Sequence, residues 1–205
     1  MTEGQFTEAD LAPSDDERRA ARKFQVERGA TGAAVLAIGL WIGGLVALGA
    51  CAAPFVFQRT PAPYSGDAMG AAFARFDSIT LGCAVVLLGA EATRTWASGK
   101  RGRTTVARVR RVLGVVLAAA AAYVAMACTP QIQALHAAGV RRNDGPQGVE
   151  LERIHKTAEL VGKLELAGGA ALIFLHVFTL GAKKPDDDDD DLRAPEPGPL
   201  PPGRL

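Results

Sequence analysis

The sequence predicts an all-α fold, an integral membrane four-helix bundle with a short N-terminal amphipathic helix and disordered tails. Apolar residues collect in four blocks rich in Ala, Gly, Leu and Val, although the whole chain, with 48% hydrophobic and 22% charged residues, has a composition close to the soluble average. The charged residues gather in the tails and in particular connections. This segregation is typical of a chain in a bilayer, because a helix needs about 20 mainly apolar residues to cross roughly 30 Å of hydrocarbon.

The first 29 residues are mostly polar and are expected to lie in the cytoplasm. Ser14 and Glu17 form the pattern of a capping box, which predicts that a short helix begins there. Basic residues from Arg18 to Arg28 and the apolar Phe24 lie along this helix. We expect the helix to rest on the anionic surface of the membrane.

The first predicted span covers residues 31–57, since no charged residue occurs between Arg28 and Arg59. Pro54 near its far end is expected to kink the helix. Small side chains recur at every fourth position of this span, and such a ridge allows another helix to approach closely. The ridge predicts helix packing, including assembly of a homo-oligomer, through Gly39, Gly43, Ala47 and Cys51.

Three further spans are predicted at about 77–96, 112–128 and 160–182. Residues 65–67 offer a helix start ahead of the second span, and Trp96 is expected at its inner interface. Pro130 marks the outer end of the third span, and Asn143 and Gly145 have the turn chemistry of the outer loop that follows. Together the spans give a transmembrane domain over residues 30–182.

The connection at 98–111 predicts the orientation. It holds no acidic residue and six basic ones: Lys100, Arg101, Arg103, Arg108, Arg110 and Arg111. Connections rich in Lys and Arg stay on the cytoplasmic side, and four crossings place the basic N-terminal segment and Lys183-Lys184 on that side too. The composition resembles that of a high-GC bacterium. We therefore expect a multi-pass protein of the plasma (inner) membrane with both termini in the cytoplasm.

Residues 183–205 contain six consecutive aspartates and a Pro-rich end, so we expect a disordered, solvated tail, with weak attraction of cations as the alternative. A net charge of +1, without basic clusters interleaved with aromatics, gives no support for a nucleic-acid partner. The lipid bilayer is the expected partner. The three cysteines lie in apolar blocks without the spacing of a zinc site.

Polar residues towards the outer side are the candidates for function, because ionisable groups are costly to insert into a membrane. Four of them share one face of the fourth helix, and two more are expected at the same level on the second helix and just beyond the third. We expect them to converge on an outward-facing polar vestibule: Glu152, His155, Glu159 and Lys163 with Asp77 and His136.

The predicted vestibule admits two interpretations. The functional one is a site for a cation or a divalent metal in a transport or export module, with Glu152, His155 and Glu159 as the candidate ligands. The structural one is that Lys163 pairs with Asp77 or Glu159 and that the other charges lie in interfacial water. Glu-x-x-His occurs often by chance, so the structural interpretation is preferred and no metal site is assigned.

No catalytic triad, phosphate-binding glycine loop or pair of catalytic carboxylates has a recognisable spacing. We therefore expect a non-enzymatic protein without a cofactor, with a redox protein that ligates a cofactor through His136 and His155 as a further alternative. His176 lies about 31 Å along the helix from His155, so the two cannot ligate one haem. We expect His176 to hydrogen-bond a neighbouring helix, and Glu91 to snorkel beside Arg94.

Five short motifs occur in order between residues 32 and 181: Gly39-Leu-Trp-Ile-Gly43-Gly44, Ala53-Pro54-Phe55-Val56-Phe57, Phe73-Ala-Arg-Phe76-Asp77, Thr129-Pro130-Gln-Ile and Arg153-Ile-His155-Lys156. In this order and spacing the chain resembles the transmembrane protein 205-like family, a membrane family of unknown function. The resemblance implies a four-helix membrane domain and an association with the handling of metal compounds. The Ala-rich third span and the aspartate run are not expected of that family, so no transported substrate follows from it.

Overall fold

The computed structural model describes residues 14–61, 64–99 and 104–180. Over these ranges the chain forms helices and no strand. Four of the helices are long and apolar enough to cross a membrane: Asp15–Arg59, Tyr64–Ser98, Thr105–Ala137 and Gly145–Thr179. The predicted all-α four-helix fold is therefore confirmed. The predictions for the C-terminal tail, and for Lys100, Arg101 and Arg103, lie outside the described residues.

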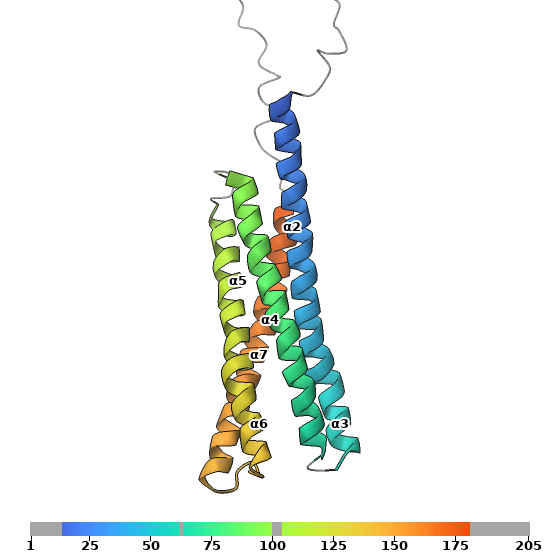
Figure 1. Ribbon diagram of the computed structural model, residues 1–205, viewed down its shortest axis with the longest axis vertical. Coiled ribbons are helices and arrows are strands. Elements are labelled where there is room, and N and C mark those ends of the chain that lie inside the picture. Colours follow the sequence, from blue (N-terminus) through green and yellow to red (C-terminus); the bar gives the residue numbers. More distant parts are fainter. Residues whose placement is uncertain (1–13, 62–63, 100–103, 181–205) are drawn as a thin grey trace, which may run out of the picture.

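The first long helix consists of α2 (Asp15–Val46), the π-helical η1 (Ala47–Ala52) and α3 (Ala53–Arg59). The predicted capping box is confirmed: the Ser14 hydroxyl accepts from the Glu17 N–H at 3.3 Å, and the Glu17 carboxylate accepts from the Ser14 N–H at 2.6 Å. The predicted short N-terminal helix is not a separate element, since it continues into the first span within α2. No proline interrupts α2, and the Thr31 hydroxyl donates to the Glu27 carbonyl at 2.8 Å where the two parts meet. Its first turns extend past the other helices (Figure 1).

Two prolines within the long helices follow directly on π-helical turns. Pro54 is the second residue of α3, after η1. Pro130 is the second residue of α6 (Thr129–Ala137), which continues α5 (Thr105–Tyr123) through the π-helical η3 (Val124–Cys128). In both places the residue before the proline donates its N–H five residues back. A proline ring clashes with the carbonyl four residues earlier, so the wider turn allows each helix to continue.

The remaining long helices are α4 (Tyr64–Ser98) and α7 (Gly145–Leu180). α4 packs between α2 and α5, and α7 also packs against α2 and α5, so the four helices form a closed ring (Figure 1). We name the end with the start of α2 and the α4–α5 connection the basic end, and the opposite end the turn end. At the turn end Asn143 and Gly145 adopt positive φ, as the turn chemistry predicted.

Glycines decide where the helices approach one another. A Cβ on Gly44 would collide with the Phe76 ring, and a Cβ on Gly169 would collide with the Ile42 side chain. The predicted ridge behaves differently, because Gly43 is exposed and a Cβ there would meet no atom of another described helix within 4 Å. All members of the ridge are exposed on α2 and η1: Gly39, Gly43, Ala47 and Cys51.

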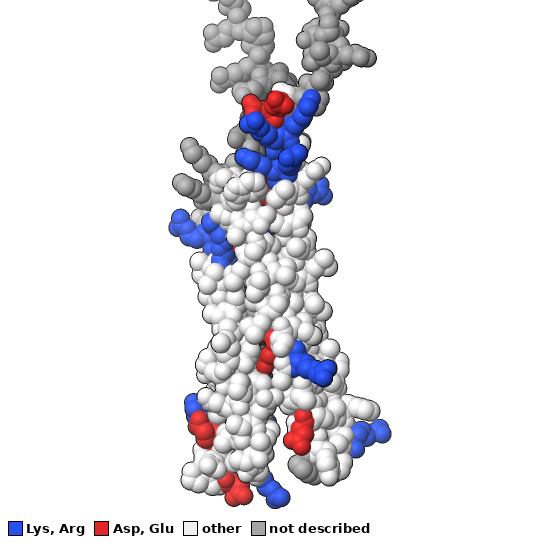
Figure 2. Space-filling view, viewed as in Figure 1, with Lys and Arg blue, Asp and Glu red and all other residues white. Residues whose placement is uncertain are grey.

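A layer of apolar side chains fills the middle of the bundle. Four apolar residues, one from each long helix and each at most 4% exposed, are named the apolar layer: Ile38, Leu87, Leu117 and Leu172. Gly114 of α5 lies against Leu87 and Leu172, which brings three helices together at this level. On the visible face most charged side chains lie towards the two ends, with a largely uncharged belt between them (Figure 2).

Candidate functional site

Polar side chains enter the bundle at three levels. On α7 these levels appear in chain order as His155, Glu165 and His176, with Leu172 of the apolar layer between the last two. The first level lies near the turn end and the last near the basic end. The apolar layer therefore separates the second level from the third.

The level nearest the basic end is an ionic network. Arg110 of α5 donates through Nε to the Glu91 carboxylate of α4 at 2.7 Å, and both side chains are 6% exposed. The same carboxylate oxygen lies 3.4 Å from Nε2 of His176 on α7. Glu91 lies near Arg94 as predicted, but the predicted snorkelling is wrong, because α5 begins at Thr105 and brings Arg110 inward to meet the carboxylate.

Arg94 joins the ionic network to α2 and α7. Its Nη1 lies 2.7 Å from Nδ1 of His176, and its Nη2 donates to the Thr179 hydroxyl at 3.4 Å. Glu27 of α2 lies 3.8 Å from the same guanidinium. Since an arginine can only donate, Nδ1 of His176 must accept, which places the imidazole proton on Nε2 facing Glu91. The expected hydrogen bond from His176 to a neighbouring helix is confirmed.

The middle level is a carboxyl site. Trp41 of α2 donates through its indole N–H to Oε2 of Glu165 on α7 at 3.2 Å, and both residues are buried. The other oxygen, Oε1, is buried and has no hydrogen-bond partner in the described chain. Glu165 is held by a single donor, although it is only 5% exposed.

Asp77 of α4 is the second acid of the carboxyl site. It is half-buried, the Thr129 hydroxyl of α6 donates to it, and it lies close enough to Glu165 to act on it electrostatically. Its Oδ2 has no partner within the described ranges, and neither does the buried hydroxyl of Thr80 one turn along α4. We name as the carboxyl site Asp77, Thr129 and Glu165 with the Trp41 indole, together with Thr80 one turn from Asp77 on α4.

Sequence reasoning did not single out Glu165 as a site residue. A signal was available, because Glu165 precedes His176 by 11 residues, or about three helical turns, and so shares its inward face. The sequence does not link Glu165 to Trp41, because the link depends on α2 and α7 being neighbours. Gly169 allows that approach, because Ile42 occupies the space that a larger side chain would need.

The level near the turn end is a histidine pair. The rings of His136 on α6 and His155 on α7 have centroids 5.6 Å apart and are tilted by 35°. Glu152, the candidate ligand that precedes His155 by three residues, pairs with Arg142 at 3.8 Å and with Lys156 at 3.5 Å. No group of three or more His, Cys, Asp or Glu residues in the described segments could hold a metal ion.

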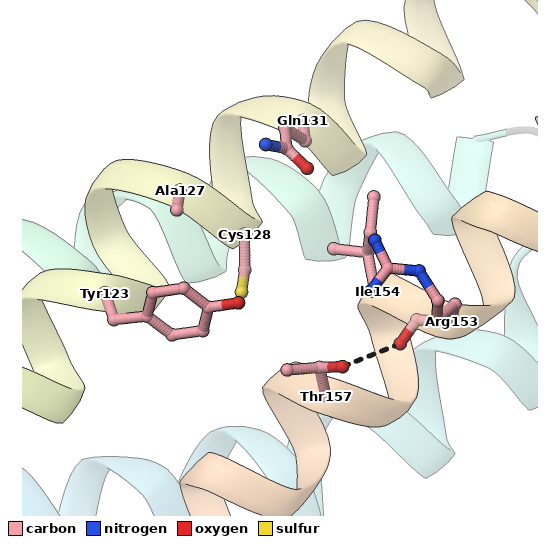
Figure 3. A pocket seen from close by; sticks show the side chains of 7 residues that line it. All are labelled: Tyr123, Ala127, Cys128, Gln131, Arg153, Ile154 and Thr157. Carbon is pink, nitrogen blue, oxygen red and sulfur yellow. Dashed lines mark hydrogen bonds between the residues drawn. The ribbon is translucent and has the colours of Figure 1, made fainter.

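The predicted vestibule residues therefore occupy separate places. Lys163 pairs with Glu159 at 2.6 Å, as the structural interpretation predicts, and both side chains are exposed. Asp77 lies apart from this pair, in the carboxyl site. A small cavity of about 150 Å³ lies between the η3–α6 segment and α7 near the turn end (Figure 3). It contains none of the vestibule residues and is lined by Tyr123, Ala127, Cys128, Gln131, Arg153, Ile154 and Thr157.

Four membrane-length helices with polar groups buried between them define a multi-pass integral membrane protein. Residues 36–141, more than half of the 205-residue chain, match the family described as a domain of unknown function (DUF4149), and the chain belongs to that family. The match begins in α2 and extends through α6, so it includes Trp41 and Asp77 but ends before Glu165. No curated protein and no solved structure matches the chain.

Proposed function

We propose that this chain is a non-enzymatic protein of the bacterial plasma membrane whose helical bundle binds a cation in the carboxyl site. The observation that carries the proposal is the pair of buried oxygens, Oδ2 of Asp77 and Oε1 of Glu165, that lack a partner in the described chain. An ionised carboxylate that is buried without compensation costs several kcal/mol. A bound positive charge offsets that cost.

If the buried acids only held the helices together, each would be expected to pair with a basic side chain. The ionic network shows such pairing, because Glu91 meets Arg110 at 2.7 Å. At the carboxyl site the nearby cations are turned outward: Arg75 is exposed, and Lys163 is 70% exposed and bonded to Glu159. Neither acid of the carboxyl site has a basic partner in the described chain, so a cation that binds there has to come from solution.

Binding and flux in reconstituted vesicles test this function. Wild-type protein is expected to bind or transport one of H⁺, Na⁺, K⁺, Mg²⁺ or Zn²⁺, and Glu165→Gln and Asp77→Asn are expected to lose that property. Glu159→Gln is the matched control, because it removes an acid of the same helix that is exposed. Wild-type vesicles that behave like protein-free vesicles towards all five cations would exclude the proposal.

The histidine pair supports a second candidate, a transition-metal site near the turn end. Nε2 of His155 is buried and has no partner in the described part of the chain, and the His136 ring lies 5.6 Å away. Two imidazoles suit Zn²⁺, Cu²⁺ or Ni²⁺. Loss of Zn²⁺ binding in His155→Ala but not in Lys156→Ala supports this candidate, and equal binding in both removes it. An absorption spectrum of the purified protein tests the cofactor-ligating alternative at the same pair.

The membrane placement is part of the same proposal. We place the basic end, both termini included, in the cytoplasm, because 98–111 holds six basic residues and no acid. Assembly of two or more copies through the exposed ridge on α2 agrees with the absence of packed atoms, within the described chain, around Gly39 and Gly43. The metal handling implied by the resemblance to transmembrane protein 205-like proteins agrees with a cation site.

A further inference from the structure

Glu165 is positioned rigidly within the bundle. Its Oε2 accepts from the Trp41 indole at 3.2 Å, and the indole itself is 2% exposed. The aromatic ring has few rotamers that fit so tight a place, so the carboxyl plane is fixed with Oε1 turned away from the donor. Oε1 is buried without a hydrogen-bond partner in the described residues, which leaves that atom as the one available for a ligand.

The groups around Glu165 are acidic or neutral. α2 contributes the Trp41 indole, and α4 contributes Asp77, which acts on Glu165 electrostatically. The thiols of Cys83 and Cys128 are buried on α4 and η3, and thiols ionise far above the carboxyl range. The charged residues nearest in sequence to Asp77 and Glu165 are exposed: Arg75 on α4, and the Glu159–Lys163 pair on α7.

This ligand set suits a proton better than a metal ion. Ca²⁺ takes six to eight oxygen ligands and Mg²⁺ a near-ideal octahedron, whereas two carboxyls and two threonine hydroxyls are present here. The indole N–H occupies Oε2 of Glu165, which leaves Oε1 for a ligand, and a proton needs a single oxygen. Two acids that act on one another electrostatically favour holding one proton between them, because both cannot ionise without repulsion.

We propose that Asp77 and Glu165 together hold one exchangeable proton in the interior of the bundle, bound as an O–H on Oε1 of Glu165 or Oδ2 of Asp77. The proton comes from and returns to water on the turn-end side, with no other bond made or broken. This inference rests on the proposed cation-binding function and names the cation. Trp41 is in direct contact with the site and reports its state.

The fluorescence of Trp41 tests the inference. The chain has two tryptophans, and Trp96→Phe leaves Trp41 as the single reporter in full-length protein in lipid nanodiscs, since Trp96 is 69% exposed on the far part of α4. A titration of pH at constant ionic strength is expected to give one transition in emission, because an ionised and a neutral carboxyl accept differently from the indole. Glu165→Gln is expected to abolish the transition, and Glu159→Gln to leave it unchanged.

Asp77→Asn gives the quantitative arm. Removing the neighbouring negative charge weakens proton binding to Glu165, so the midpoint is expected to fall by about one pH unit or more. The midpoint in Asp77→Asn tests the shared proton even if circular dichroism shows that Glu165→Gln does not fold. An unchanged midpoint in Asp77→Asn, or a transition that survives in folded Glu165→Gln, overturns the shared-proton site.

A second titration separates the inference from the function on which it rests. Na⁺, K⁺, Mg²⁺ or Zn²⁺ is added at fixed pH in the same Trp96→Phe background. Emission that follows one of these ions but not pH overturns the proton while leaving the cation-binding function in place. Emission that follows neither pH nor any ion overturns both. Emission that follows pH alone is the expected result.

Discussion

Replacing Glu91 with glutamine removes the negative charge at the centre of the ionic network and keeps the size of the side chain. Glu91 lies 2.7 Å from Arg110 and 3.4 Å from His176, and none of the three side chains is more than 6% exposed. The glutamine carbonyl can still accept from Arg110, so the variant loses charge compensation more than a hydrogen bond. Arg94 then faces Glu27 alone, at 3.8 Å.

The expected loss follows from this geometry. Removing one member of a buried ion pair typically costs about 3 to 5 kcal/mol, because the partner charge stays buried. An interhelical hydrogen bond in a membrane protein averages only about 0.6 kcal/mol. Since the introduced glutamine retains a hydrogen bond, we expect Glu91→Gln to lower the free energy of unfolding by about 3 kcal/mol, the lower end of that range. Adding Arg110→Gln removes the uncompensated charge, and the double variant is expected to recover part of the loss.

Unfolding in lipid bicelles, followed by steric trapping or by titration with a denaturing detergent, measures these differences. Glu159→Gln is the control, because its partner Lys163 is 70% exposed and the pair is screened by water. The reasoning is refuted if Glu91→Gln is no less stable than Glu159→Gln. A double variant that loses the full sum of the two single effects would show that Glu91 and Arg110 do not act as a pair.

Substitutions at two neighbouring glycines, Gly43 and Gly44, are expected to affect assembly and folding separately. Gly43→Leu adds a side chain to the exposed ridge and is expected to reduce the oligomeric mass in detergent without loss of thermal stability, whereas an unchanged mass would remove this face as the contact. Gly44→Leu is expected to destabilise the monomer, as measured by its melting temperature, because the new side chain collides with the ring of Phe76. Reporter tags next to Arg103 and next to Asn143 are expected on opposite sides of the membrane, and tags found in one compartment would contradict the four-crossing topology.

The helices were predictable because their cause is local. Apolar blocks of spanning length predict the four crossings, and the Ser14 hydroxyl caps the first helix as the chemistry of that residue requires. The extent of the helices was less predictable, since a hydropathy block marks only the part in hydrocarbon. Arg110 was therefore assigned to a connection, although it lies on α5 and faces the core.

The carboxyl site was not predictable in full because its cause is tertiary. The sequence shows that Glu165 and Trp41 lie in apolar surroundings, but their contact depends on which helices are neighbours and how each is rotated. The regular spacing of the charged residues from Glu152 to Lys163 predicted a polar vestibule. Such regularity is also typical of a helix face in contact with water, and Lys163 is indeed exposed and paired along its own helix.

The apolar layer decides how a charge at Glu165 can be used. Ile38, Leu87, Leu117 and Leu172, all at most 4% exposed, form an apolar layer that offers no hydrogen-bond partners to a file of water molecules. Under the shared-proton proposal, a proton that arrives from one side has to leave by the same side. The bundle then acts as an electrical insulator that senses acidity on one face of the membrane without discharging the gradient across it.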